Sequence, residues 1–319
     1  MMLARVAESL YWMARYLERA EDTARLINAS TMMLMDMPQT ATFGWENLLK
    51  VVGLHEPFHE HYDEASETAV MSFLIQDERN PSSIFACVRH ARENTRTFRE
   101  VLPRESWEWV NELYLYTSTH LAIALDRRKR FEVLNEIIRR RQAVVGLLSG
   151  TMSRDEAFQF MRLGRNIERA DMTTRVLDVS YAVHLPTQAG QSNDLVWMSV
   201  LHALSAHQMY RRHVGVHAKS HKVLAFLLND SLFPRSLRHC LYEIHGALNE
   251  LPGTGPHRQL QSLTVQLDSA DFRKLAEAGL HGFCDRLQAG LGSLSESIGA
   301  AYFRAAHTQS LSQKQFSLT

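Results

Sequence analysis

The same stretch of sequence occurs twice in this chain, 150 residues apart, and this duplication constrains the fold more than any other feature. Residues 13–27 read MARYLERAEDTARLI, and residues 163–177 read LGRNIERADMTTRVL. Both copies share the framework Arg-x-x-Glu-Arg-Ala-x-x-Thr-x-Arg. Placed on a helix at about 100° per residue, each copy gathers its apolar residues on one face. The duplication therefore predicts two related helices that bury the same face in a core.

Opposite the apolar face, each copy carries a stripe of polar and charged side chains. The first stripe comprises Arg15, Glu18, Arg19, Asp22, Thr23 and Arg25, and the second comprises Arg165, Glu168, Arg169, Thr173 and Arg175. Residues four apart on a helix are neighbours, so Arg15 repels Arg19, and Glu18 repels Asp22. Only Glu21–Arg25 and Asp171–Arg175 have opposite charges in the favourable order. The stripes are therefore better suited to partners on another element than to solvent.

Pairing between the two stripes satisfies these charges most simply. We expect Glu18 to meet Arg169, and Arg19 to meet Glu168, across a pseudo-twofold axis. An arginine-lined surface favours the charged form of a carboxyl group, so both glutamates should stay ionised. Two interpretations remain open. One is a structural ion-pair network, which is weak evidence for stability when it is buried; the other is a polar groove that binds a ligand or a partner.

Composition restricts the class of protein. The chain has 319 residues, is 45% hydrophobic and 22% charged, and carries 35 basic and 35 acidic residues. These values are typical of a globular protein and favour neither nucleic acid nor a membrane surface as a partner. The three widely spaced cysteines indicate no disulfide framework, and we expect a reducing, cytoplasmic setting. The N-terminus is charged throughout, unlike a signal peptide, and no apolar run is long enough to span a membrane.

Helical periodicity dominates the chain and predicts an all-α fold, a bundle of roughly ten helices. Among them we expect a first helix over about residues 3–34, which ends before Pro38, and another over about residues 107–125. Residues 184–193 are expected to form a linker. The duplication divides it into two related halves, residues 1–150 and 151–319, which we expect to pack as a single domain. Ser82 is expected to cap the helix that follows Pro81, and Ser153 with Glu156 should form a capping box before the second repeat. The run Arg139-Arg140-Arg141 is typical of a solvated helix face.

Two histidine-rich stretches raise the question of a metal site. Residues 55–61 read HEPFHEH, but Pro57 argues against a regular helix there, and we expect a polar loop. His213, His217 and His221 are spaced to lie on one face of a helix, which we expect to be a polar face or an interface. We therefore predict neither a metal site nor a cofactor. The sequence also lacks a phosphate-binding loop, a dinucleotide-binding motif, a nucleophile elbow and an HExxH motif.

Five blocks of sequence together resemble the bacterial alpha-E family. They are RVAESLYWMARYLERAEDTARL (5–26), NPSSI and ARENTR (80–84 and 91–96), LGRNIERADMTTRVLD (163–178), MYRR (209–212) and FPRS (233–236). The resemblance spans nearly the whole chain. It implies an all-helical domain, encoded beside or fused to circularly permuted ATP-grasp ligases and often near transglutaminase-like cysteine peptidases. An ATP-grasp ligase is therefore the expected partner, and a transglutaminase-like protein is a second one.

By position, the resemblance marks Glu18 and Glu168 as the family's glutamates and the flanking arginines as their companions. The same blocks contribute the secondary candidates Arg92, Glu93, Arg96, Arg211, Arg212 and Arg235. The copies differ where Met172 replaces Asp22, and the second is richer in arginines without an obvious partner, namely Arg162, Arg165 and Arg169. If one copy handles an anionic group such as a carboxylate or acyl phosphate, we expect it to be the second.

Three hypotheses follow from these observations. In the first, the protein is a non-catalytic helical partner of an ATP-grasp amidoligase and uses the Arg/Glu stripe to hold the acceptor or to dock the ligase. In the second, it is an independent enzyme that acts on amides or peptides with Glu168 as acid or base, although no nucleophile signature is present. In the third, it is a pure assembly scaffold.

Overall fold

The computed structural model describes residues 2–36, 44–182 and 191–303, and in these ranges the fold is entirely helical. The α-helices are α1 (Ala4–Asp36), α2 (Trp45–Val51), α3 (His55–His59), α4 (Glu67–Ile75), α5 (Ile84–Thr97), α6 (Arg104–Leu125), α7 (Arg127–Thr151), α8 (Glu156–Ala182), α9 (Gln191–Ala203), α10 (His207–His213), α11 (Ser220–Asn229), α12 (Leu237–Asn249), α13 (His257–Asp268), α14 (Phe272–Glu277) and α15 (Leu280–Ile298). A 3₁₀ turn (Arg99–Val101) and a π-helical turn (Gly299–Phe303) complete the list.

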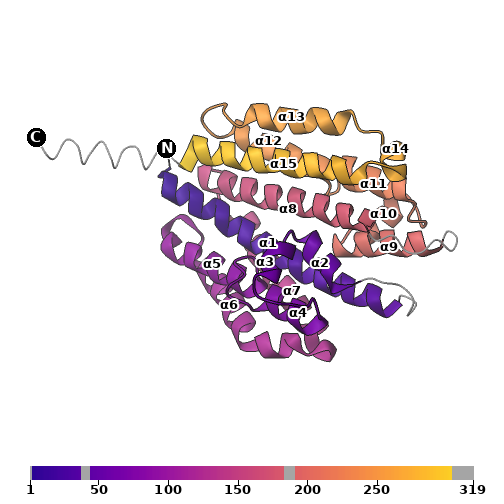
Figure 1. Ribbon diagram of the computed structural model, residues 1–319. Coiled ribbons are helices and arrows are strands. Elements are labelled where there is room, and N and C mark those ends of the chain that lie inside the picture. The colour runs from indigo at the N-terminus through magenta and orange to yellow at the C-terminus, as the bar shows by residue number, and fades with distance from the viewer. Residues whose placement is uncertain (1, 37–43, 183–190, 304–319) are drawn as a thin grey trace, which may run out of the picture.

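Helices α1 and α8, which contain the two copies of the repeat, pack against each other at the centre of the molecule. Figure 1 shows α2 to α7 gathered on one side of this pair and α9 to α15 largely on the other. Helix α1 also packs on α5, α7 and α9, whereas α8 packs on α12 and α15. The central pair is therefore enclosed by helices from both parts of the chain.

The apolar faces predicted from the two copies are confirmed as core. Six positions on this face of each helix, counted from one turn before the copy begins, are all at most 4% exposed; they are Leu10, Met13, Leu17, Ala20, Ala24 and Ile27, followed by Phe160, Leu163, Ile167, Ala170, Thr174 and Leu177. Removal of this apolar surface from water is the main force that holds the two long helices together.

The two central helices approach each other closely at Gly164. A Cβ atom at this position would lie 2.2 Å from the backbone oxygen of Tyr11. No side chain fits in that space, so the contact between α1 and α8 depends on glycine at this position. The first copy has Ala14 at the corresponding place.

The structure contains fifteen α-helices in its described ranges rather than the roughly ten expected from the sequence. The difference arises from short helices where the sequence indicated loops or longer elements. Residues 55–59 form α3 in spite of Pro57, because Pro57 is the third residue of the helix. Its missing N–H belongs to the first turn, where no intrahelical partner exists.

Two predicted caps are replaced by neighbouring residues. Ser83, not Ser82, caps α5 by accepting a hydrogen bond from the Ala86 amide. At the start of α8 the side chain of Asp155 accepts from the Phe158 amide, and Glu156 instead accepts from the backbone N–H of Met2. In both cases the predicted helix start is correct to within a few residues, and the capping residue is wrong.

The predicted row of three histidines on one helix is also wrong. Helix α10 ends at His213, His217 lies in the connection, and α11 begins at Ser220. Gly215, with φ of 139°, turns the chain between them. Most of the predicted linker at 184–193 lies outside the described residues, as do residues 37–43 and 304–319. None of the helices described has the length and apolar content needed to cross a membrane.

Candidate functional site

The two charged stripes meet between α1 and α8, as the duplication predicted. Arg19 binds Glu168 through two nitrogens, at 2.5 and 3.0 Å, and Arg15 Nε donates to the same carboxylate at 2.7 Å. In the other direction Arg169 binds Glu18 through two nitrogens, at 2.7 and 3.1 Å. The reciprocal Glu18–Arg169 and Glu168–Arg19 pairing is therefore confirmed.

Two further arginines join the network on the Glu18 side. Arg141, from α7, contacts both Glu18 and Glu21. Arg235, in the loop before α12, lies 2.5 Å from Asp22, 2.9 Å from Glu21 and 3.2 Å from Glu18. The network thus ties together four segments that are far apart in the sequence.

The two central glutamates are buried and ionised. Burial alone raises the pKa of Glu168, but Arg19 and Arg15 outweigh it and bring that pKa down to about 2. Glu18 is fully buried, and Arg141, Arg169 and Arg235 likewise hold its pKa well below the usual range in spite of the burial. The expectation that both glutamates stay charged is borne out, and their partners are arginines of the same chain.

Asp22 behaves differently from its neighbours. Burial and the nearby charges of Glu18 and Glu21 outweigh Arg235 and raise the pKa of Asp22 to about 7. Its Oδ2 atom is buried without a hydrogen-bond partner in the described structure. The second copy has Met172 at this position, so the Glu168 side carries no third carboxylate of this kind.

The centre of the Arg/Glu stripe is consequently a closed network rather than an open groove. Glu18 and Glu168 are at most 2% exposed, so a ligand can reach only the outer edges of the arginines. Arg25 and Arg175 form the predicted pairs within their own helices, at 2.8 Å from Glu21 and 2.7 Å from Asp171.

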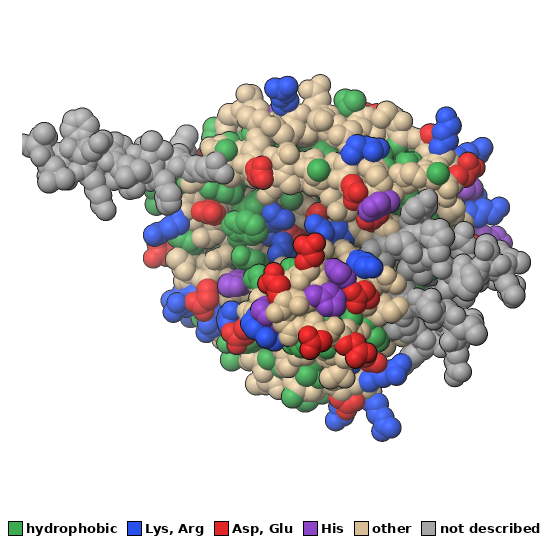
Figure 2. Space-filling model, in the orientation of Figure 1, with side chains coloured by type: hydrophobic (Ala, Val, Ile, Leu, Met, Phe, Trp, Pro, Cys, Tyr) green, Lys and Arg blue, Asp and Glu red, His purple; other side chains and the backbone are tan. Residues whose placement is uncertain are grey.

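One edge of the network borders a groove of about 550 Å³ between α1, α8 and α15. Its lining combines three arginines, three carboxylates and three aromatic rings: Arg15, Arg19, Arg175, Glu8, Asp171, Glu296, Tyr11, Trp12 and Phe303. Figure 2 shows Lys and Arg side chains set back from the surface along the seam beside α8. Arg15 is fixed there by Glu168 and by Ser295 of α15, whose hydroxyl lies 3.1 Å from Arg15 Nη1.

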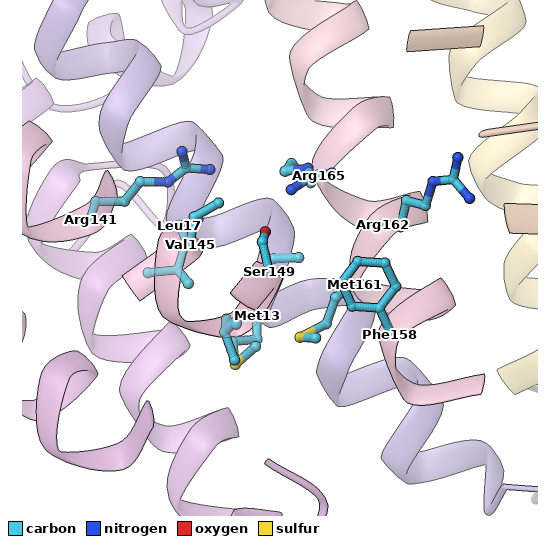
Figure 3. Close-up of a pocket in the computed structure, with 11 residues that line it drawn as sticks. Met13, Leu17, Arg141, Val145, Ser149, Phe158, Met161, Arg162 and Arg165 are labelled. Atoms are coloured by element: carbon cyan, nitrogen blue, oxygen red, sulfur yellow. The ribbon is translucent and has the colours of Figure 1, made fainter. Parts of the chain in front are cut away.

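A second, narrower cavity of about 30 Å³ lies between α1, α7 and α8. Figure 3 shows Arg165 between Arg141 and Arg162, with the apolar side chains of Met13 and Met161 below them. Arg162 is paired with Glu243 at 2.8 Å. Arg165 has neither a hydrogen bond nor an ion pair among the described residues, and its Nε atom is buried without a partner.

The copies of the repeat therefore differ at one arginine. In the first copy Arg15 binds Glu168; the equivalent partner of Arg165 would be Glu18, which Arg141, Arg169 and Arg235 already occupy. Burial and the neighbouring charges of Arg169 and Arg141 lower the pKa of Arg165 to about 10. Of the three second-copy arginines that appeared unpaired in the sequence, only Arg165 is unpaired in the structure.

Among the secondary candidates, only Arg235 belongs to the network. Arg92 bonds to Asn111 at 2.7 Å and stacks on aromatic rings of α6, and Glu93 pairs with Arg96 on the surface of α5. Arg211 and Arg212 are exposed on α10.

Sequence reasoning missed Arg141, which was expected on a solvated face and is 3% exposed. A signal was present: Arg141 follows buried Ile137 by four residues and precedes buried Val144 by three, in register with the apolar face of α7.

Comparison with known proteins identifies the family of this chain. Residues 2–303 match the Alpha-E family, described as a predicted alpha-helical domain with a conserved ER motif, and Glu18-Arg19 and Glu168-Arg169 are such pairs. Uncharacterised proteins of Mycobacterium bovis and of two Mycobacterium tuberculosis strains, CDC 1551 and H37Rv, are 24% identical over 323 residues. The match covers 93% of this chain but only 35% of each relative, so the chain spans about a third of their length. No solved structure matches significantly. On the extent of the family match, the chain belongs to the Alpha-E family.

Proposed function

We propose that this protein is a non-catalytic partner of an ATP-grasp amidoligase and that it holds the peptide or amino-acid acceptor in the groove between α1, α8 and α15. The observation that carries the proposal is the lining of that groove, where arginines, carboxylates and aromatic rings surround about 550 Å³. This mixture matches the chemistry of an amino acid or a peptide end, which carries an anion, a cation and a side chain.

Each class of lining residue has a role in this proposal. Arginine binds a carboxylate through two parallel hydrogen bonds, carboxylates such as Glu8 and Glu296 attract an ammonium group, and Trp12 offers a flat apolar surface. The buried glutamates act indirectly. Glu168 holds Arg15 and Arg19 in place, so these side chains lose little freedom when a ligand binds.

The protonation of the buried cysteines and of Glu168 favours binding over catalysis. Burial raises the pKa of the Cys87 and Cys240 thiols to about 12, so neither forms a thiolate near neutral pH. Glu168, with a pKa of about 2, has no proton to donate under the same conditions. This counts against the alternative in which Glu168 is the acid or base of an independent enzyme.

The family setting supplies the ligase. The resemblance in the five sequence blocks implies a circularly permuted ATP-grasp neighbour, and the mycobacterial relatives carry the matching region within chains about three times as long. In those longer chains the matching region has other protein segments beside it, which supports a role as the partner of another domain.

Arg165 is the proposed site for a small anionic group, which assigns that role to the second copy of the repeat. A partly buried arginine without a counter-charge gains most from an anion. Acetate or phosphate should therefore raise the melting temperature of the wild-type protein more than that of Arg165→Gln. Equal shifts in both proteins would remove Arg165 from the proposal.

Co-elution tests the proposal as a whole. We expect the protein to form a stable complex with the ATP-grasp protein encoded beside it, and the complex to hydrolyse ATP in the presence of acceptor peptides faster than the ligase alone. The absence of both a complex and an effect on turnover would contradict the partner role.

A matched pair of variants tests the groove. Glu8→Gln with Arg175→Gln removes two charges from its rim, and we expect the KM for the acceptor to rise about 10- to 100-fold while the complex persists. Glu78→Gln with Arg89→Gln likewise removes one negative and one positive charge, near the start of α5 and away from the groove, and serves as the control. Unchanged KM in the groove variant would favour the scaffold interpretation, whereas loss of the complex would make the groove the docking surface for the ligase.

A further inference from the structure

Glu46, His55 and His59 bring three potential metal ligands together on the surface, outside the charged network and its groove. One ligand atom from each residue lies within 4.8 Å of the other two. Glu46 is on α2, and the two histidines are one helical turn apart on α3. Figure 2 shows histidine and acidic side chains side by side over this part of the molecule. The short helix α3, which the sequence did not predict, is what places both rings on one side.

Both rings direct the same atom, Nε2, at one oxygen of Glu46. His59 Nε2 lies 3.0 Å from Glu46 Oε1, and His55 Nε2 is in contact with that oxygen as well. Two imidazole nitrogens gathered around one carboxylate oxygen supply the donor atoms of a metal site with three protein ligands.

The other nitrogen of His59 indicates which ring atom carries the proton. Nδ1 lies 3.2 Å from the backbone oxygen of Tyr62, and a carbonyl oxygen only accepts hydrogen bonds. In the tautomer in which Nδ1 donates to this carbonyl, Nε2 presents its lone pair towards Glu46. This is the tautomer in which a histidine ligates a metal through Nε2. A backbone carbonyl that fixes the tautomer is also the usual outer partner of a metal-bound histidine.

The carbonyl that orients His59 is itself held firmly. The Tyr62 ring stacks on the fully buried ring of Phe58, with centroids 4.8 Å apart, and its hydroxyl donates to Asp77 at 2.8 Å. Arg79 forms an ion pair with Asp77 and lies over the Tyr62 ring, so it contacts both of these side chains. The outer shell is thus rigid although the three ligand side chains are 34% to 38% exposed.

We propose that Glu46, His55 and His59 bind a transition-metal ion, with Zn²⁺ as the best match. Two imidazole nitrogens and one carboxylate suit Zn²⁺, whereas Mg²⁺ and Ca²⁺ take oxygen ligands. The exposure of all three side chains leaves the remaining coordination position open to water or to an external ligand. The site does not depend on the proposed role of the groove.

A second cluster of similar composition does not share this geometry and provides a control. His281 contacts Asp178 through Nδ1 at 2.7 Å and Asp285 through Nε2 at 3.5 Å. Its two ring nitrogens face different carboxylates, and the cluster offers a metal one imidazole nitrogen where the Glu46 cluster offers two. We expect no specific metal binding there.

The experiment is a titration of the full chain, without a histidine tag and after treatment with a chelator, with ZnCl₂ in the presence of a chromophoric zinc indicator. We expect one strong site per chain, weakened at least about tenfold in His55→Ala, in His59→Ala and in Glu46→Gln, and unchanged in His281→Ala. Addition of Co²⁺ in place of Zn²⁺ should produce visible absorption bands that report nitrogen and oxygen ligands. The same bands should be absent from the His59→Ala protein.

Each alternative outcome overturns the proposal. Wild-type protein that takes up no Zn²⁺ would show that the three side chains form an ordinary hydrogen-bonded cluster. Equal weakening in His281→Ala would show that the ion binds non-specifically. Melting temperatures of the metal-free variants separate both outcomes from misfolding, because all three substitutions lie at the surface and should leave them close to wild type.

Discussion

At the residue scale, Glu18 is held by charge from three different helices or loops. It is fully buried and is paired with Arg169, Arg141 and Arg235. We predict that Glu18→Gln lowers the free energy of unfolding by about 3–5 kcal/mol, because it leaves buried arginines without their counter-charge. Chemical denaturation should show this loss, while the exposed control Glu78→Gln should change stability by less than about 0.5 kcal/mol. Similar values for the two variants would mean that the network adds nothing to stability.

Substitutions at the buried centre of the network test stability rather than ligand binding. A glutamate that is closed off by arginines of its own chain cannot be probed by a Glu→Gln change without disturbing the fold. Functional tests of the network therefore belong at its edges, on Glu8, Arg175 and Arg165, where the side chains border cavities.

Asp22 gives a second residue-scale prediction, through its pKa of about 7 in the folded chain against 3.8 for an ordinary aspartate. A raised pKa in the folded state means that stability is fully present below about pH 4 and is lost as the pH rises towards 7. The loss is on the order of 4 kcal/mol for a buried group with this shift. Asp22→Asn mimics the neutral form, so we expect it to melt close to wild type at about pH 4 and progressively above wild type as the pH rises to 8. A difference that does not change with pH would show that Asp22 is ionised throughout the range.

At the scale of elements, the crossing of α1 and α8 depends on Gly164. Alanine normally stabilises a helix interior relative to glycine, but here its Cβ would meet the Tyr11 backbone oxygen at 2.2 Å. We predict that Gly164→Ala lowers the free energy of unfolding by about 1–3 kcal/mol through this overlap. Gly146→Ala in α7, where nothing lies within 4 Å of the new Cβ, should instead raise it by about 0.5–1 kcal/mol. Thermal or urea unfolding of both variants measures the change in the free energy of unfolding. A change of the same sign in both variants would contradict a close crossing.

Helix prediction from the sequence succeeded for long periodic segments and failed for short helices. The expected helices at residues 3–34 and 107–125 appear as Ala4–Asp36 and Arg104–Leu125, because their apolar stripes run over several turns. Helices α3 and α10 have 5 and 7 residues, too few for a periodic signal. The errors at the caps of α5 and α8 arise because residues one or two positions apart, Ser82 and Ser83 or Ser153 and Asp155, offer similar capping groups.

At the scale of the whole molecule, the charged network joins parts of the chain on both sides of residue 150. We predict that fragments 1–150 and 151–319 do not fold cooperatively when they are expressed alone, since each would expose the apolar face of α1 or α8 together with unpaired charges. Mixed or co-expressed fragments should recover a cooperative thermal transition, measured by circular dichroism. A cooperative transition in either isolated fragment would show that the halves are independent domains.

The sequence by itself determined the helical class, the two central helices, their buried faces and the reciprocal pairing of Glu18 and Glu168 with arginines of the opposite copy. These features are encoded locally, in the 3.6-residue period and in the order of charges along one helix. The tertiary structure alone decided that Arg141 and Arg235 complete the network, that Arg165 is left without a partner, and that Glu46 meets His55 and His59. Those contacts join residues of separate elements, and no local pattern specifies which loop or helix comes within a few ångströms of a given charge once the apolar faces have packed.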